Sequence, residues 1–373
     1  MSRRHLLTAL GFTAVSAIAL AGCASAAPTS GGEGTDAAAA TSVEDFGSFE
    51  ALEEAAKAEG ALNVIALPRD WANYGEILDL FAERYPEITI TEDAPDASSA
   101  EEIQAAKNNA GQDNAPDVFD LGLTVALQNT DMFAPYQVQT WDDIPDALKE
   151  PTGLFVGDYG GYMSVGYDSS KFPEITKLDD LLGAEFKGAV ALNGDPTQAG
   201  AAFAGVGLAA LLKSGGLDDF QPGIDFFQEL NAAGNFLKVD VTPATIASGE
   251  TPVVFDWDYL NAVHTADNED WKVVVFDDLG YAGYYYQAIN KDAPHPAAAR
   301  LWQEFLYSDE VQNLWLKGGA RPARMDAMIE AGTIDADLAA ALPATPAETF
   351  VPTEEQSTAA GELLGSEWAS AIR

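Results

Sequence analysis

The sequence predicts an α/β protein whose body has two lobes, and three observations lead to this fold class. Short apolar or β-branched runs alternate with helical patterns, which is typical of a largely parallel sheet flanked by helices. The roughly 330 residues beyond residue 43 exceed what a single hydrophobic core normally serves. Two β-rich segments, 160–167 and 283–289, are placed where the chain would cross from one lobe to the other and back.

The first 43 residues are predicted to lie outside this body. Arg3-Arg4 precedes an apolar run, Leu6 to Ala21, of the length found in signal peptides. The run ends in Leu20-Ala21-Gly22-Cys23, which resembles a bacterial lipobox and implies that residues 1–22 are removed and that Cys23 is lipidated. Residues 23–43 are rich in small residues and are expected to form a flexible tether.

The same leader also resembles a twin-arginine export signal, and the choice between this route and the general one stays open. Cys23 is the single cysteine of the chain. Once it carries lipid, the body has no thiol for a disulfide, a metal site or a nucleophile.

Lobe 1 is predicted to comprise residues 44–160 and 285–373. Its first part should contain helices over 49–59, 74–85 and 100–109 and strands over 61–66, 88–91 and 117–121. Its second part should contain helices over 296–307, 309–317 and 354–372. Because strand and helix alternate, the strands should be parallel, and ligands should bind beyond their carboxyl ends.

Lobe 2 is predicted over residues 161–284. Strands are expected over 187–192, 252–255 and 272–277, and helices over 196–213, 220–233 and 242–248. The helix that follows Pro196 is almost wholly apolar, so it should be buried. Its first N–H groups could bind a carboxylate or phosphonate, although Asp195 competes for them as the expected N-cap.

The candidate site begins with Asp256-Trp257-Asp258-Tyr259, which directly follows a buried strand. A tryptophan face attracts a cation, and a neighbouring carboxylate pairs with it. Asp70-Trp71 repeats this chemistry on a strand-to-helix loop. If the two clusters lie on opposite lobes, Trp71 and Trp257 could sandwich an amine-bearing solute. Ordinary packing of both tryptophans is equally compatible with these residues.

The predicted site assigns three roles. Asp258 pairs with the amine, assisted by another aspartate, tyrosines supply hydroxyl groups, and Thr197 and Gln198 hold the distal polar end. The full ligand-binding set is Asp70, Trp71, Tyr74, Asp120, Tyr159, Thr197, Gln198, Asp256, Trp257, Asp258, Tyr259 and Tyr284.

Composition and motifs exclude several classes of function. A formal net charge of -40 argues against nucleic-acid binding, which depends on Lys and Arg, and is compatible with attracting cations. G-x-S-x-G, H-E-x-x-H and P-loop motifs are absent, and Gly205-x-Gly207-x-x-Ala210 lies inside a predicted helix and not after a strand. We therefore expect no enzyme activity, cofactor or metal. A hydrolase with a carboxylate pair, and a surface scaffold, stay as alternatives.

One segment resembles a known family. Asn290 to Pro296 and Ser308-Asp309-Glu310-Val311-Gln312, together with the lipobox and the two-lobe pattern, resemble the extracellular solute-binding proteins of ABC importers. The resemblance is to the branch that holds polyamine, ferric-iron and phosphonate or sugar-phosphate binders. The resemblance implies a type 2 periplasmic-binding-protein fold that closes on its ligand by a hinge. It also implies a membrane-anchored monomer that delivers a small solute to permease subunits.

The same resemblance narrows the solute. Ferric-iron binders of this branch carry two adjacent tyrosines, whereas here Tyr259 is followed by Leu260. Polyamine binders carry Trp with Asp at about the positions of Trp257 and Asp258. The resemblance therefore implies a polyamine, or a zwitterion whose acidic end lies near Thr197, with ferric iron or a sugar phosphate as alternatives.

Overall fold

The computed structural model describes residues 36–373. The predicted signal peptide, the lipidation site at Cys23 and most of the predicted tether lie outside these residues. Within the described part, no helix has both the length and the apolar character needed to cross a membrane.

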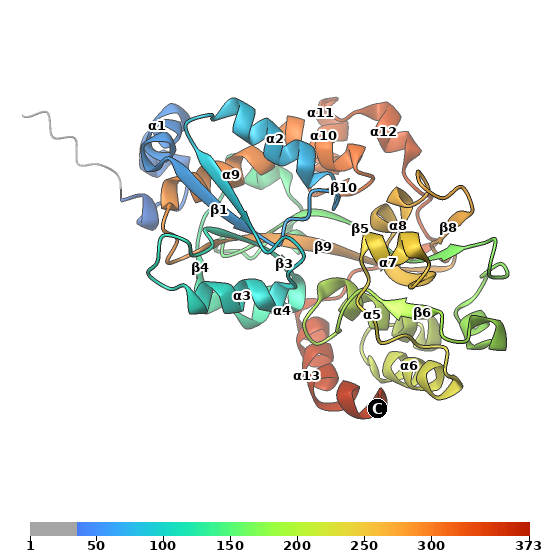
Figure 1. Ribbon diagram of the computed structural model, residues 1–373. Helices are drawn as coiled ribbons and strands as arrows, with labels where there is room; N and C mark the ends of the chain where they lie inside the picture. Colours follow the sequence, from blue (N-terminus) through green and yellow to red (C-terminus); the bar gives the residue numbers. More distant parts are fainter. Residues whose placement is uncertain (1–35) are drawn as a thin grey trace, which may run out of the picture. The chain divides into compact units, whose positions relative to one another are not determined.

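A mixed sheet of nine strands runs through the described part (Figure 1). Its centre is an antiparallel pair of long strands, β5 (Val156–Asp168) and β9 (Leu279–Asn290). These two strands contain the segments that the sequence predicts as crossings between lobes. The shorter strands of the sheet are β3 (Val118–Gly122), β4 (Phe133–Ala134), β6 (Val190–Leu192), β7 (Val253–Trp257), β8 (Trp271–Val274), β10 (Arg321–Pro322) and β11 (Glu348–Phe350).

Helices cover the sheet in two groups, which we call lobe 1 and lobe 2. Lobe 1 is built around β3, β4 and a separate parallel pair, β1 (Ala61–Ile65) and β2 (Thr89–Asp93). Its helices are α1 (Phe49–Glu59), α2 (Tyr74–Arg84), α3 (Ser99–Asn108), α4 (Leu123–Gln128), α9 (Pro296–Leu306) and α10 (Asp309–Lys317). Lobe 2 is built around β6, β7 and β8, with α5 (Gly200–Ser214), α6 (Gln221–Ala233), α7 (Pro243–Ser248) and α8 (Asp258–Val263). The chain ends with α11 (Met325–Ala331), α12 (Ala336–Ala341) and α13 (Glu354–Ala371).

The predicted α/β class is confirmed, but the large sheet is mixed and not mostly parallel. β1 and β2 are parallel, as expected, whereas β3 pairs antiparallel with β9. Just before β3, the backbone N–H of Asp117 donates to the carbonyl of Asn63 in β1 at 2.9 Å. The backbone N–H of Asn63 donates to Asp117 Oδ2 at 2.7 Å, so a side chain replaces a backbone carbonyl there. Residues beyond the ends of β1, β2 and β3 still reach the same edge of lobe 1.

The apolar helix α5 begins at Gly200, four residues later than Pro196, where the sequence predicts its start. Asp195 is not its N-cap. The Asp195 carboxylate accepts hydrogen bonds from the backbone N–H and the hydroxyl of Thr197, at 2.8 and 2.7 Å. Its carbonyl accepts from Gln198 and Ala199. This local turn separates the predicted cap from the helix, whose true N-cap residue, Ala199, has no capping side chain.

The folded body begins before the predicted end of the tether. Short 3-10 turns span Ala37–Ala39 and Val43–Phe46. The Arg300 guanidinium is buried and donates to the carbonyls of Ala38 and Ala40, at 2.9 and 2.8 Å. These bonds fix the segment against α9.

The C-terminal helix α13 contacts both lobes, whereas the sequence assigns it to lobe 1 alone. Trp368 packs edge-on against Phe227 of α6, with ring centroids 5.8 Å apart. On the other side, α13 rests on α4 at Gly361, where a Cβ atom would lie 2.8 Å from Thr124 Cγ2. Gly365, one turn later, has open space at its Cβ position.

These two glycines give a matched pair of substitutions. Gly365→Ala should stabilise the protein by about 1 kcal/mol, because alanine favours the helix and meets no neighbour. Gly361→Ala gains the same helix propensity, but its added methyl group pushes α13 away from α4. This variant should therefore be less stable than Gly365→Ala by about 1–3 kcal/mol. Urea denaturation of both variants measures the difference. Equal stability would mean that α13 does not press on α4 at Gly361.

Candidate functional site

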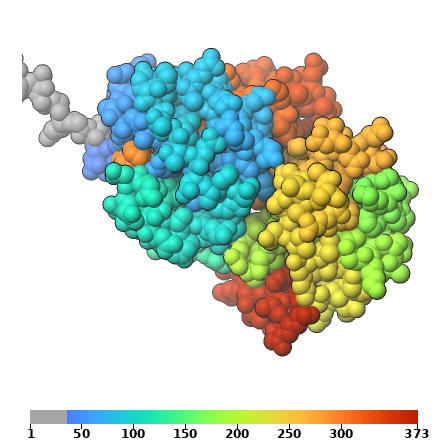
Figure 2. Space-filling model, viewed as in Figure 1, coloured from blue at the N-terminus to red at the C-terminus, as the bar shows by residue number. Residues whose placement is uncertain are grey.

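A cavity of about 600 Å³ lies between the two lobes. Lobe 1 contributes the loops that follow β1 and β2 and the end of β3, and lobe 2 contributes the loops around β6, α7 and β7. In Figure 2, the blue and cyan atoms of lobe 1 face the yellow atoms of lobe 2 across a furrow. The cavity is therefore an interlobe cleft at the carboxyl ends of strands, where α/β sheets bind ligands.

Acidic residues carry the charge in the wall of this cleft. Among the described residues that line it, none is Lys or Arg, and the one histidine is His264. Burial lowers the pKa of His264, which disfavours its charged form. The acidic lining residues are Asp70, Asp96, Glu101, Glu102, Asp120, Asp195, Asp240 and Asp256.

Asp120 supplies the carboxylate of lobe 1. Its Oδ2 accepts hydrogen bonds from the hydroxyls of Tyr74 and Tyr159, at 3.0 and 2.9 Å. Its Oδ1 has no hydrogen-bond partner among the described residues. Burial raises the pKa of Asp120 to about 7, although the two tyrosine hydrogen bonds oppose the rise. The Oδ1 atom is thus a buried acceptor without a hydrogen bond from the described part of the chain in the wall of the cleft.

Glu102, which also lines the cleft, contacts Asp120. Its Oε2 accepts the backbone N–H of Asp120 at 3.0 Å, and its side chain is almost wholly buried. Burial, and then the charge of Asp120, raise the pKa of Glu102 well above its usual value. A positive ligand at Asp120 would relieve this crowding of acids.

Asp256 supplies the corresponding carboxylate of lobe 2. Asn193 donates its amide to Asp256 Oδ2 at 2.9 Å, and the Trp257 backbone N–H donates to Oδ1 at 2.8 Å. Burial raises the pKa of Asp256 to about 7. Both lobes therefore present a buried carboxyl group to the cleft without a basic partner.

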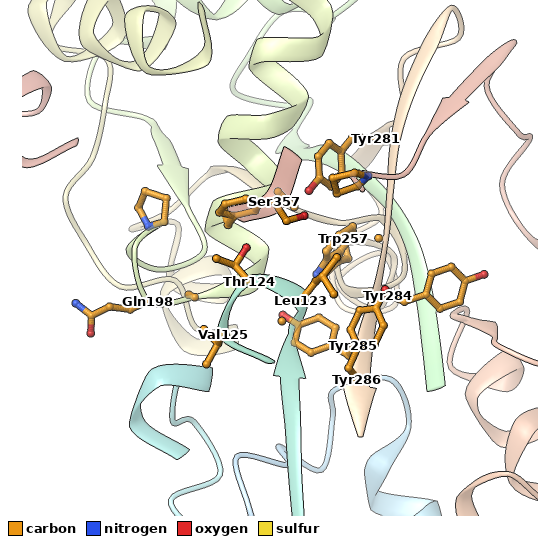
Figure 3. A pocket seen from close by; sticks show the side chains of 18 of the residues that line it. Leu123, Thr124, Val125, Gln198, Trp257, Tyr281, Tyr284, Tyr285, Tyr286 and Ser357 are labelled. Atoms are coloured by element: carbon orange, nitrogen blue, oxygen red, sulfur yellow. The ribbon is translucent and has the colours of Figure 1, made fainter. Parts of the chain in front are cut away.

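The predicted tryptophan sandwich is not formed. Trp71 lines the cleft and donates its indole N–H to the Tyr159 hydroxyl at 2.8 Å. Trp257 lines a separate, smaller cavity of about 50 Å³, which Figure 3 shows together with Thr124 and Tyr281. Tyr285 stands between them, with its ring centroid 5.6 Å from Trp71 and 6.4 Å from Trp257. Successive strand residues face opposite sides, so Asp256 and Trp257 of β7 cannot both face the cleft.

Asp258 does not reach the cleft either. The strand ends at Trp257 and α8 begins at Asp258, so the alternation that would align Asp258 with Asp256 stops there. Asp258 is fully buried and accepts a hydrogen bond from Arg321 at 3.1 Å. Tyr259 is also buried and stacks nearly parallel to Trp257. Neither residue lines the two cavities described above.

The other predicted residues fall into three places. Asp70 and Gln198 line the cleft, and Thr197, Gln198 and Tyr284 line the smaller cavity. Tyr74 and Tyr159 lie below the cleft and donate hydrogen bonds to Asp120. On β9 the ring that lines the cleft is that of Tyr285, whereas the predicted Tyr284 lines only the smaller cavity.

The pair of Asp258 and Arg321 gives a stability prediction. Arg321→Leu should destabilise the fold by about 3–5 kcal/mol, because it leaves a buried carboxylate without its partner. Adding Asp258→Asn should recover most of this loss. Chemical denaturation of the single and double variants measures both effects. If Asp258→Asn instead lowers the stability of the Arg321→Leu variant further, the unpaired carboxylate is not the cause of the destabilisation.

Sequence reasoning missed Tyr285, Glu102 and Asn193. The loop after the second predicted strand, which contains Asp96, was correctly expected to lie at the binding edge. Glu102 gives no local signal, because an acid in the first turn of a helix is normally exposed. Among the described residues, no group of three or more His, Cys, Asp or Glu side chains is arranged to hold a metal ion.

Solved structures of low sequence identity share this fold. The periplasmic binding protein AgtB from A. tumefaciens R10, solved with agropinic acid, is 16% identical with a TM-score of 0.67, covering 84% of this chain and 98% of its own. AfuA from Actinobacillus pleuropneumoniae, solved with fructose-6-phosphate, is 17% identical with a TM-score of 0.64 and coverages of 84% and 98%. Iron-bound HitA from Pseudomonas aeruginosa is 16% identical with a TM-score of 0.58 and coverages of 83% and 99%.

These neighbours confirm the two-lobed periplasmic-binding-protein fold, and the variety of their ligands leaves the solute open. A search of curated protein sequences finds no match. The sequence model of a bacterial extracellular solute-binding family matches residues 114–340, which is more than half of the chain. The protein therefore belongs to the bacterial extracellular solute-binding proteins.

Proposed function

We propose that this protein captures an amine-bearing organic cation in the cleft between its lobes and delivers it to the permease subunits of an ABC importer. Family membership makes the chain a solute-binding protein and not an enzyme. The lipid on Cys23 would hold it at the outer face of the membrane, as a monomer on a short tether.

One observation carries the choice of solute. The wall of the cleft holds acidic side chains from both lobes and, among the described residues, no Lys or Arg. Asp120 and Asp256 are buried there without a basic partner, which is costly unless a ligand supplies the positive charge. The edge-on pair of Trp71 and Tyr285 adds aromatic surface beside Asp120, which suits an alkylammonium group.

A zwitterion is the second candidate, and the start of α5 favours it. Gly200 and Ala201 line the cleft, and the first backbone N–H groups of this helix have no side-chain cap. Free N–H groups at a helix N-terminus attract a carboxylate or phosphonate. An amine at Asp120 or Asp256 could then be combined with an acidic group at α5.

Ferric iron has less support. Leu260 lines the cleft where a second tyrosine would stand in a paired-phenolate site, and Tyr259 is buried away from it. Tyr285 is the one tyrosine among the described residues that line the cleft. A single phenol among carboxylates does not form the paired-phenolate site.

Thermal-shift screening of the purified protein tests the proposal, because a tight ligand raises the midpoint of unfolding. The panel contains putrescine and spermidine, amino acids and aminophosphonates, neutral sugars, sugar phosphates and Fe(III). We expect shifts from the amines, or from the zwitterions if α5 is used. Shifts produced only by Fe(III), sugars or sugar phosphates would overturn the proposal.

A further inference from the structure

Beside its acids, the cleft contains a patch of apolar side chains on lobe 2. Five of the lining residues form this apolar patch, namely Val241, Pro243, Ile246, Leu260 and Val263. Pro243 and Ile246 belong to α7, and Leu260 and Val263 belong to α8. A solute that carried nothing but charged groups would leave the patch without an apolar partner. The patch therefore indicates which kind of amine-bearing cation the cleft accepts.

Two residues of the patch lie three positions apart on α8, Leu260 and Val263, so they share one side of the helix. Leu260 is buried, whereas Val263 is 43% exposed. Large hydrophobic residues with so much exposure are few in the described part of the chain, and the others, Ile329 and Val351, do not line the cleft. An exposed valine at the wall of a ligand site offers its surface to an apolar part of the ligand.

A compact cluster behind the patch holds it in place. Ile246 is buried together with Val254 of β7 and Trp271 of β8, and Val241 packs against them. The hydroxyl of Thr242 caps the start of α7. The patch is thus fixed by the sheet and by a capped helix. A surface that is already ordered favours selective binding, because little free energy is lost in ordering it when the ligand arrives.

The end of α8 lies close to an acid of lobe 1. His264 directly follows Val263 and lines the cleft with it. Burial lowers the pKa of His264, and the negative charge of Asp70 opposes this effect. Asp70 stands on the loop after β1 and lines the same cleft. The patch is therefore within electrostatic reach of the acidic wall of lobe 1, and one solute can contact both.

A hydrocarbon end on the solute fits this arrangement better than a second charge. Moving a methylene group from water onto an apolar surface strengthens binding about fourfold. An ammonium group placed against the patch would instead lose its hydration without gaining a partner. The cleft, with a volume of about 600 Å³, has room for hydrocarbon beside the ammonium group.

We propose that the solute is an amphipathic amine, with one ammonium group that pairs with the acids of the cleft and a hydrocarbon end that lies on the apolar patch. Leu260 and Val263 are then specificity-determining residues, because they favour a methyl group where a polyamine carries a second ammonium group. This inference rests on the proposed function and deepens it, since it selects one class among the amine-bearing cations.

Calorimetric titration of the parent protein with n-pentylamine and with putrescine, both at pH 8, tests this preference. The two ligands have the same chain length, but n-pentylamine has a methyl group where putrescine has its second ammonium group. We expect n-pentylamine to bind about tenfold more tightly, because it gains apolar contact and avoids the desolvation of a charge. Equal affinities, or tighter binding of putrescine, would overturn the inference.

Two substitutions at Val263 test whether the preference comes from the patch. Val263→Thr keeps the shape of the side chain and replaces a methyl group by a hydroxyl group. It should weaken n-pentylamine binding about fivefold and leave putrescine binding nearly unchanged. Val263→Asp adds a carboxylate and should reverse the preference in favour of putrescine. Because Val263 is exposed, both variants should fold as the parent does.

Val351→Thr is the matched control. Val351 is 40% exposed, which is close to the exposure of Val263, but it lines the smaller cavity and not the cleft. Its substitution should change neither affinity. If the parent binds amines and Val263→Thr alters both affinities alike or neither of them, or if only the zwitterions bind, the inference is wrong while the proposed function stands. If the parent binds none of the amines or zwitterions, both are wrong.

Discussion

Replacing Asp120 or Asp256 by Asn should weaken binding of an amine ligand by roughly 100-fold, which corresponds to about 3 kcal/mol. Each substitution keeps the shape of the side chain and removes the charge that the ligand would pair with. Isothermal titration with putrescine or spermidine, at pH 8, where both carboxyls are largely ionised, measures the loss.

The same two variants should be more stable than the parent at pH 8 in the absence of ligand. A buried carboxylate without a basic partner destabilises the fold, and Asn removes that charge. Lost binding together with gained stability would exclude misfolding as the cause. Asp142→Asn, at an exposed acid outside the cleft, should change neither property. Parent-like affinity in both cleft variants would show that the site has been misplaced.

Amine affinity should fall as the pH drops through about 7, because burial raises the pKa of both Asp120 and Asp256 to about 7. Below this pH each carboxyl is increasingly protonated, and a neutral acid cannot pair with an ammonium group. Between pH 8 and pH 6 we expect at least a tenfold loss of affinity. Titration calorimetry in two buffers of different ionisation enthalpy should also show protons released on binding near pH 7.

The stability of the unliganded protein should fall as the pH rises, whereas the affinity for an amine rises. The pKa of each carboxyl is raised from an ordinary value of 3.8, so between about pH 4 and pH 7 the folded protein holds more protons than the unfolded chain. These groups therefore stabilise the fold at low pH, and their contribution is lost as the pH rises through about 7. The free energy of unfolding, measured by denaturation across this pH range, should change less steeply with pH in Asp120→Asn than in the parent. Affinity that does not vary with pH would contradict the assignment of these two acids.

Much of the fold follows from local patterns. Helices such as 49–59 and strands such as 61–65 are specified by apolar periodicity, and two β-rich segments correctly locate β5 and β9. The mixed pairing of the sheet does not follow, because it depends on contacts between distant segments. The hydrogen bond from the Asn63 backbone N–H to the Asp117 carboxylate is one example, since no local sequence pattern predicts it.

The site was predicted less completely than the fold, for a reason visible at Asp256-Trp257-Asp258. The sequence places this stretch at a strand end, but it does not say at which residue the strand turns into a helix. That single boundary decides that Asp256 faces the cleft while Trp257 and Asp258 turn away. Burial of Glu102 and Asp158 is likewise a property of the assembled lobes, and acidic residues carry no local sign of it.

We propose that the cleft recognises a positive charge on the solute. Isothermal titration with putrescine and with its neutral isostere 1,4-butanediol tests it most directly, because the two share length and shape and differ in charge. We expect saturable binding of putrescine, at micromolar concentration or tighter, and no measurable binding of the diol. Equal binding of both, or binding of the diol alone, would contradict it.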